Sequence, residues 1–337
     1  MSVIVTSPSR LHIALIDMNG ELGRVDGGIG VALKEPFLKI EVSAVDKETE
    51  QRANTEEIVT ILERLKERTQ PTLRGNYRVK IFKELPSHVG LGSRTQLSLS
   101  VAKAISVLEN RNYHALDLAK LVGRGGTSGI GTAAFENGGF ILDGGHLFRL
   151  ASADSTKEHE NEVPKTSFLP SSAAMFPPPP VLFQQPLPED WFFVVAIPEV
   201  KRGAHGLEEI SIFKRYCPVE REEVAKICRI VLMRILPSVL ENDIHTFAES
   251  LTMLQRIGFK RIETELQHDI IKELFRFFDA HALGYGMSSF GPATYAIVKG
   301  ENRAKTLADS TREFFTERHV HALVSYSSAN NDGSEVS

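Results

Sequence analysis

The sequence predicts an α+β fold with two domains, residues 1–170 and 171–337. With 337 residues and 42% hydrophobic content, the chain can bury more than one core. Segments with strand-like alternation mix with segments of helical periodicity, without the strict alternation of a doubly wound sheet. A polar, serine-rich stretch at residues 151–185 contains four consecutive prolines, and we expect the domain boundary within it.

Each element of the first domain follows from its local pattern. Apolar and β-branched residues at 2–6, 11–17, 29–33 and 37–45 predict strands, with breaks at Pro8 and Pro36. Apolar residues recur with helical spacing at 54–68, 93–110 and 115–122, and residues 77–82 return to alternation.

The second domain begins with a continuous apolar run at residues 191–197, which predicts a buried strand. The tail from residue 327 is expected to fray, and the charged residues at 260–265 to face solvent. The remaining predicted elements are helices at 220–235, 241–256, 267–280 and 303–316, and strands at 287–290, 293–298 and 320–325.

Composition excludes several classes of protein. A formal charge of -4 and a pI near 6.3 argue against a broad basic surface for nucleic acid. Cys217 and Cys228 lack zinc-ligand spacing, which favours structural thiols in a reducing compartment. The sequence shows neither a signal peptide nor an apolar stretch long enough to span a bilayer. We therefore expect a cytoplasmic protein without nucleic-acid or membrane partners.

Residues 84–99 read ELPSHVGLGSRTQLSL, a glycine-punctuated turn that leads from a strand pattern into a helical one. Glycine lets the backbone approach an anion closely, and the N–H groups that begin the helix point at that anion. A guanidinium and a hydroxyl in the first helical turn suit phosphate oxygens, although Ser93 could also simply cap the helix. The predicted phosphate contacts are His88, Gly90, Gly92, Ser93, Arg94 and Thr95.

Three segments resemble the GHMP kinase superfamily, named for galactokinase, homoserine, mevalonate and phosphomevalonate kinases. They are PSRLHIALID, LPSHVGLGSRTQLSL and GMSSFGPATYAIV, and their order and spacing cover nearly the whole chain. The resemblance implies an N-terminal domain of the left-handed βαβ type and a ferredoxin-like C-terminal domain, with the active site between them.

Within that superfamily, the chain resembles the β-ribofuranosylaminobenzene 5′-phosphate synthase family. The segments that carry this resemblance include RLHIALIDMNGELGRVDGGIGVAL, VGRGGTSGIGTAAFENGGFILDGGH and IPEVKRGAHGLEEISIFKRYCP. It implies a homodimer that joins phosphoribosyl pyrophosphate to 4-hydroxybenzoate or 4-aminobenzoate, releasing pyrophosphate and carbon dioxide, in methanopterin biosynthesis. Mg²⁺ fits such a reaction because it binds phosphate oxygens with few protein ligands.

The chain departs from the kinase pattern at two positions. Gly131 stands where many superfamily kinases carry an Asp that acts on the accepting hydroxyl, and the nearest acids in sequence are Glu136 and Asp143. Arg94 replaces a serine usual in the kinase loop and adds charge for a pyrophosphate. These departures favour the synthase over an ATP-dependent small-molecule kinase, which remains the alternative. A non-catalytic sensor of a phosphorylated metabolite is a third hypothesis.

The catalytic candidates under this resemblance are Asp17, Arg24 and Asp26, in a glycine-bearing segment, and His12 on the first strand. Arg24 could clamp the acceptor carboxylate or a donor phosphate, and Asp26 could bind Mg²⁺ or ribose hydroxyls. A turn with exposed charges and a structural His12 are the plainer interpretations. Three more loops supply further candidate substrate contacts, although the basic one among them could be a solvated loop. These contacts are Arg124 and Ser128; Lys201, Arg202 and His205; and Ser288, Ser289 and Gly291.

Overall fold

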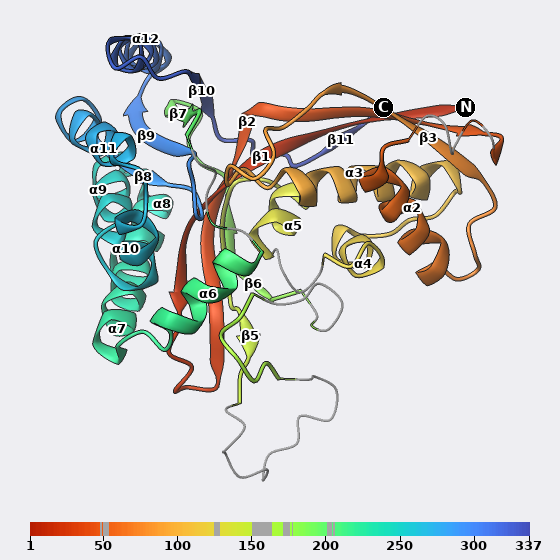
Figure 1. Cartoon of the computed structure of the whole chain (residues 1–337), viewed down its shortest axis with the longest axis horizontal. Coiled ribbons are helices and arrows are strands. Elements are labelled where there is room, and N and C mark those ends of the chain that lie inside the picture. The colour runs from red at the N-terminus through yellow and green to blue at the C-terminus, as the bar shows by residue number, and fades with distance from the viewer. Residues whose placement is uncertain are drawn as a thin grey trace.

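A long antiparallel hairpin runs through the computed structural model (Figure 1). It consists of β1 (Ser2–Asp17) and β2 (Arg24–Val45). The predicted breaks at Pro8 and Pro36 are wrong, because both strands continue and only their register shifts, between Pro8 and Ser9. Such a bulge lets a ladder pass a proline, which has no N–H to donate. The structure describes residues 1–47, 49, 54–124, 129–149, 164–170, 176, 178–200, 204 and 206–337.

The hairpin lies in an antiparallel sheet that also takes in the end of the chain. Its other described strands are β3 (Asn76–Lys83), β4 (Phe140–Asp143), β5 (His146–Leu147), β6 (Val181–Gln185) and β11 (Glu335–Val336). The order is β11-β1-β2-β4-β6, and β3 and β5 also pair with β2. The expected fraying of the tail is wrong, because β11 pairs with β1 and Ser337 N donates to Ile4 O over 2.9 Å.

Helices pack beside the hairpin, and the periodicity predicts the first three of them. They are α2 (Glu56–Arg68), α3 (Ser93–Leu108), α4 (Ala115–Leu121) and α5 (Gly129–Glu136). The apolar stripe of α2 is buried against α3, α4 and the hairpin in one hydrophobic cluster. α3 begins immediately after the predicted phosphate loop, with Gly92 as its N-cap residue.

The second half of the chain forms its own antiparallel sheet. Its strands are β7 (Trp191–Pro198), β8 (Gly284–Met287), β9 (Thr294–Lys299) and β10 (Ala322–Ser328). Their order, β10-β7-β9-β8, is the ferredoxin-like order that the family resemblance implies. Because β6 belongs to the first sheet and β7 to the second, the chain passes between the two sheets at residues 186–190.

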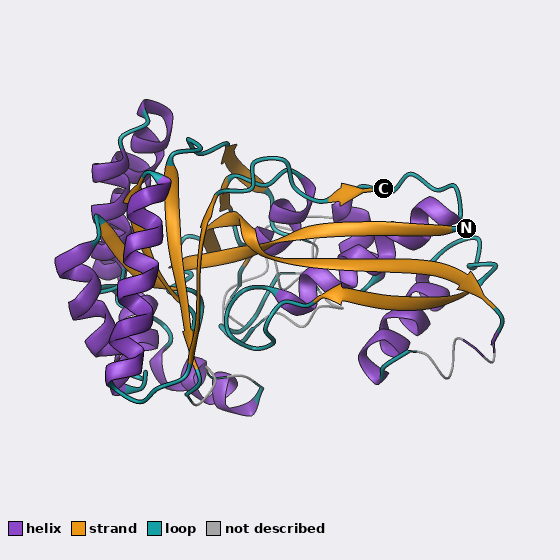
Figure 2. Ribbon diagram, turned by 90° about the horizontal axis from the view of Figure 1, so that it is seen from above, coloured by secondary structure: helices purple, strands orange, loops and turns teal. Residues whose placement is uncertain are grey.

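The helices of this half gather at one end of the molecule (Figure 2). A π-helical turn, Val231–Ile235, joins α7 and α8, and the predicted helix at 220–235 covers both α7 and this turn. The predictions omitted α6 and α8, which have 10 and 6 residues. The described helices are α6 (Leu207–Tyr216), α7 (Arg221–Ile230), α8 (Leu236–Glu241), α9 (Ile244–Leu254), α10 (Gly258–Glu265), α11 (Asp269–His281) and α12 (Glu301–Glu317).

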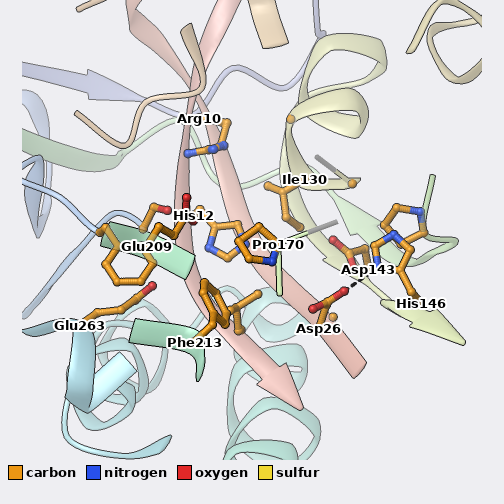
Figure 3. Close-up of a pocket in the computed structure, with 17 residues that line it drawn as sticks. Arg10, His12, Asp26, Ile130, Asp143, His146, Pro170, Glu209, Phe213 and Glu263 are labelled. Atoms are coloured by element: carbon orange, nitrogen blue, oxygen red, sulfur yellow. Dashed lines mark hydrogen bonds and ion pairs between the residues drawn. The ribbon is translucent and has the colours of Figure 1, made fainter. Parts of the chain in front are cut away.

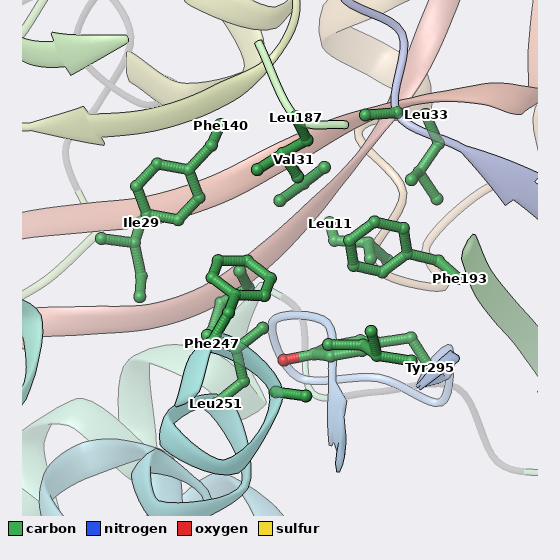
Figure 4. Close-up of a cluster of buried hydrophobic side chains, with 14 of the residues drawn as sticks. Leu11, Ile29, Val31, Leu33, Phe140, Leu187, Phe193, Phe247, Leu251 and Tyr295 are labelled. Carbon is green, nitrogen blue, oxygen red and sulfur yellow. The ribbon is translucent and has the colours of Figure 1, made fainter. Parts of the chain in front are cut away.

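One hydrophobic core joins the two halves (Figure 4). Leu11 and Phe140 enter it from the first sheet, and Phe193, Phe247 and Tyr295 from the second half. Phe140 meets Phe247 edge to face, with ring centroids 5.8 Å apart. This shared core fixes the first strand and the phosphate loop against the turn between β8 and β9. Within the part of the chain that the structure describes, no helix is long and apolar enough to cross a membrane.

Candidate active site

Three segments far apart in the sequence meet at the phosphate loop. Ser288 Oγ donates to Gly90 O over 2.6 Å and accepts from His12 N over 2.8 Å. Arg10 Nη1 donates to the same Gly90 carbonyl over 2.5 Å. Gly90 has a φ of +96°, and a Cβ there would lie 2.2 Å from Ser288 O. Only glycine fits at position 90. The buried Ser288 connects the phosphate loop to the first strand through its two hydrogen bonds.

The phosphate loop borders a cavity of about 210 Å³, here called the phosphate cavity. It unites most of the phosphate contacts predicted from the sequence. Arg124 Nη2 donates to Thr95 Oγ1 over 3.0 Å, which joins the second glycine-rich turn to the first turn of α3. The predicted residues that line it are His88, Gly90, Gly92, Ser93, Arg94, Thr95, Arg124, Ser289 and Gly291.

Three guanidinium groups line the phosphate cavity together with the carboxylate of Glu209, and those of Arg10 and Arg124 are buried. Burial lowers the pKa of Arg10 to about 10, and repulsion from Arg124 adds to the effect. Burial also lowers the pKa of Arg124 to about 10, with further repulsion from Arg94 and Arg64. Among the described residues, the buried Nε of Arg10 has no hydrogen-bond partner. Buried cations that repel each other would be stabilised by a bound anion, so the charges of this cavity suit one.

Figure 3 shows a second cavity of about 160 Å³, here called the acceptor cavity. Arg10, Glu209, Ser289 and Phe290 line both cavities. Its walls combine apolar side chains with a few titratable groups, as is typical of small-molecule sites. The apolar members are Leu15, Ile130, Pro170, Pro179, Phe213 and Phe290, and the titratable ones include His12, Asp26, Asp143, His146 and Glu263.

Asp26 lies at the centre of a buried ionic cluster in the acceptor cavity. It accepts from Lys165 Nζ over 2.8 and 3.0 Å, and His146 Nδ1 lies 2.6 Å from its Oδ2. Burial alone would raise the pKa of Asp26, but the hydrogen bond from His146 and the charge of Lys165 outweigh it, so this pKa is lowered. Asp26 is therefore ionised and paired at neutral pH.

Asp143, the last residue of β4, has a raised pKa, in contrast to the lowered pKa of Asp26. Gly145 N donates to its Oδ1 over 3.0 Å, and burial raises the pKa of the carboxyl to about 7. Burial, followed by Arg10 and Lys260, lowers the pKa of His12 well below its usual value. His12 is therefore a neutral imidazole in the acceptor cavity.

Two predicted catalytic residues lie outside both cavities. Arg24 donates from Nε and Nη2 to the carbonyls of Gly144 and Gly145, over 2.8 Å each, and thereby braces the turn after Asp143. Asp17 accepts from Asn19 N and Gly20 N within its own turn. Their catalytic roles remain predictions. The predicted contacts Ser128, Lys201, Arg202 and His205 lie outside the described residues.

Sequence reasoning missed the partners of these groups and misplaced one segment. Lys260 and Glu263, expected to face solvent, form a buried ion pair, and Lys260 Nζ donates to Ser289 O over 3.0 Å. The sequence contained a signal for this ion pair, because Lys260 and Glu263 are three positions apart and therefore share one face of α10. No local pattern distinguished Arg10, His146 or Lys165.

Comparison with known proteins identifies the family. The chain is 42% identical over 307 residues to β-ribofuranosylphenol 5′-phosphate synthase of Methanothermobacter thermautotrophicus, which covers 88% of this chain and 89% of that protein. The synthase of the same name from Methanocaldococcus jannaschii is 40% identical over 99% of this chain and 100% of its own. The chain belongs to this synthase family.

Synthases of this family share a fold with the GHMP kinases. Residues 56–139 match the GHMP kinases N terminal domain, and residues 235–317 match GHMP kinases C terminal. Homoserine kinase from Cytophaga hutchinsonii superposes with a TM-score of 0.66 at 15% identity, over 100% of this chain and 97% of that one. Mevalonate kinase from Methanococcus jannaschii gives 0.61 at 11% identity, over 97% and 98%. The predicted two-domain GHMP fold is confirmed.

Proposed function

We propose that this synthase joins phosphoribosyl pyrophosphate to 4-hydroxybenzoate through a new carbon–carbon bond. The product is a C-riboside 5′-phosphate, and pyrophosphate and carbon dioxide are released. The observation that carries the proposal is the pair of adjoining cavities, one cationic and one largely apolar, with Arg10 lining both. The name of the relatives specifies a ribofuranosyl phenol, which favours the hydroxy acid over 4-aminobenzoate.

The pyrophosphate of the donor would occupy the phosphate cavity. The first turn of α3 offers backbone N–H groups, while Arg10, Arg94 and Arg124 offer guanidinium groups. Negative charge grows on pyrophosphate as its bond to the ribose breaks. These cations would therefore stabilise the transition state more than the bound substrate.

Mg²⁺ would enter bound to the donor, as part of the substrate, and neutralise the leaving pyrophosphate. In the described parts of the chain, no group of three His, Cys, Asp or Glu residues could hold a metal ion. An Mg²⁺ ion that is held mainly by phosphate oxygens and water needs only one or two protein ligands. Glu209, which lines both cavities, would supply a protein carboxylate beside it.

The acceptor ring would lie in the acceptor cavity, among Ile130, Phe213 and Phe290. Its nucleophile is the ring carbon that bears the carboxylate, and loss of carbon dioxide restores the aromatic ring, so no base needs to remove a ring proton. A β-product from an α-configured donor means net inversion at the anomeric carbon, which one displacement provides without a covalent enzyme intermediate. We further propose that the chain acts as a cytoplasmic homodimer in methanopterin biosynthesis, as the family resemblance implies.

The direct test incubates the full chain with phosphoribosyl pyrophosphate, Mg²⁺ and carboxyl-labelled 4-hydroxybenzoate, and counts released carbon dioxide. We expect release that requires both substrates, with a smaller response to labelled 4-aminobenzoate. No release from either acid, together with ATP-dependent phosphorylation in a metabolite screen, would refute the proposal in favour of a kinase. No reaction in both assays would favour a sensor.

A further inference from the structure

Asp143 lines the acceptor cavity but not the phosphate cavity. Arg10, Glu209, Ser289 and Phe290 border both cavities, so the ribose carbon under attack lies near them. Figure 3 shows Asp143 with Asp26 and His146 on the side of the cavity opposite Glu209. An acceptor whose reacting carbon faces the donor therefore directs its para-substituent, across the ring, toward Asp143.

The Asp143 carboxyl lines the acceptor cavity and is held there by backbone N–H groups. Its Oδ1 accepts from Gly145 N, and Gly28 also donates a backbone hydrogen bond to this carboxyl. A Cβ on Gly129 would lie 2.6 Å from Oδ2, and one on Gly28 would lie 3.5 Å from it. Glycine at these two positions therefore lets the backbone lie close to Oδ2, while the Asp143 side chain still lines the acceptor cavity.

The groups around Asp143 give the two carboxyls of this cavity different protonation behaviour. Asp26 on β2 is paired with Lys165 and with His146 on β5, and its pKa is lowered. His12 on β1 is neutral, and burial raises the pKa of Asp143 to about 7. Neighbouring carboxyls whose pKa values are pushed apart commonly divide the roles, one staying ionised and the other exchanging a proton.

We propose that the Asp143 carboxylate accepts the proton of the acceptor's para-hydroxyl group during attack on the ribose and returns it after decarboxylation. This inference rests on the proposed function. As the ring carbon bonds to the ribose, the carbon–oxygen bond to pyrophosphate breaks and its electron pair leaves with pyrophosphate. The hydroxyl becomes a carbonyl, and its proton moves to the Asp143 carboxylate. The bond to the carboxylate then breaks, carbon dioxide leaves, its electron pair restores the ring, and the oxygen recovers the proton.

The test compares wild type with Asp143→Asn, using 4-hydroxybenzoate and 3-fluoro-4-hydroxybenzoate, whose hydroxyl is a stronger acid. We expect kcat to fall on the order of 10²-fold or more with 4-hydroxybenzoate, the usual range for loss of a general base. The loss should be several-fold smaller with the fluorinated acceptor, because a stronger acid depends less on a base. A purely structural role would lower both rates equally. Asp117→Asn, on the exposed face of α4, is the matched control and should keep wild-type activity.

The pH profile of wild type provides a second measurement that needs no variant. The kcat/KM for 4-hydroxybenzoate should fall as the pH drops below about 7, where Asp143 becomes protonated. This fall should be weaker with the fluorinated acceptor, whereas titration of the donor would affect both acceptors equally. An active wild type with identical profiles for the two acceptors, or an Asp143→Asn variant with equal losses or none, would overturn the role of Asp143 alone. A wild type inactive with both acceptors would overturn the proposed function itself.

Discussion

Replacement of Arg10 by Met should separate stability from anion binding. The pKa of about 10 means that the ligand-free protein disfavours the charged guanidinium by about 3 kcal/mol. The lost hydrogen bond to Gly90 O costs about 1 kcal/mol, so Arg10→Met should leave the free energy of unfolding unchanged or raise it by up to about 2 kcal/mol. A bound anion reverses this balance, because it pairs with the guanidinium that the empty cavity disfavours.

The assay is urea unfolding with and without inorganic pyrophosphate and Mg²⁺. A ligand at about 100 times its Kd stabilises the native state by about 2.7 kcal/mol, and Arg10→Met should lose most of this gain. Arg78→Met, on the exposed face of β3, is the matched control and should keep it. The reasoning fails if Arg10→Met is destabilised by more than about 2 kcal/mol without ligand, or if pyrophosphate stabilises it as much as wild type.

Three further predictions concern the buried contacts of the site. Gly90→Ala places a Cβ 2.2 Å from Ser288 O and should lower the free energy of unfolding by about 1–3 kcal/mol in urea; full stability would contradict the packing. Lys165→Met leaves Asp26 without its cation, at a cost of about 3–5 kcal/mol at neutral pH. Because the low pKa of Asp26 adds stability that is lost on acidification, this variant should also lose less stability in acid. Asp143 has a raised pKa, so it favours the native state at low pH and loses that contribution as the pH rises to about 7. Asp143→Asn should therefore be the more stable protein above that pH, and an unchanged pH dependence of unfolding would contradict the assignment.

Local signals were sufficient for the longer helices and for the glycine-bearing turn that leads into α3. The apolar stripe of α2 is readable from its spacing, and Gly90, Gly92 and Ser93 mark a turn into a helix wherever the helix packs. The same reasoning read Pro8 as a strand end. Whether a proline ends a strand or shifts its register depends on the partner strand, which a local pattern does not contain.

The acceptor cavity depended on contacts distant in sequence. His146 and Lys165 reach Asp26 across 120 and 139 positions, and the pairing of β2 with β4 sets Asp143 beside them. The local sequence around each of these residues does not indicate that the side chain is buried or which partner it has.

The sequence by itself determined the family, the α+β class and the phosphate loop, because these depend on motif order and on short-range backbone preferences. Only the tertiary structure decided which charges are buried and paired, as Lys260 and Glu263 illustrate. The physical reason is that the pKa and partner of a charged side chain are set by burial and by neighbours, and both exist only once the two sheets share their core.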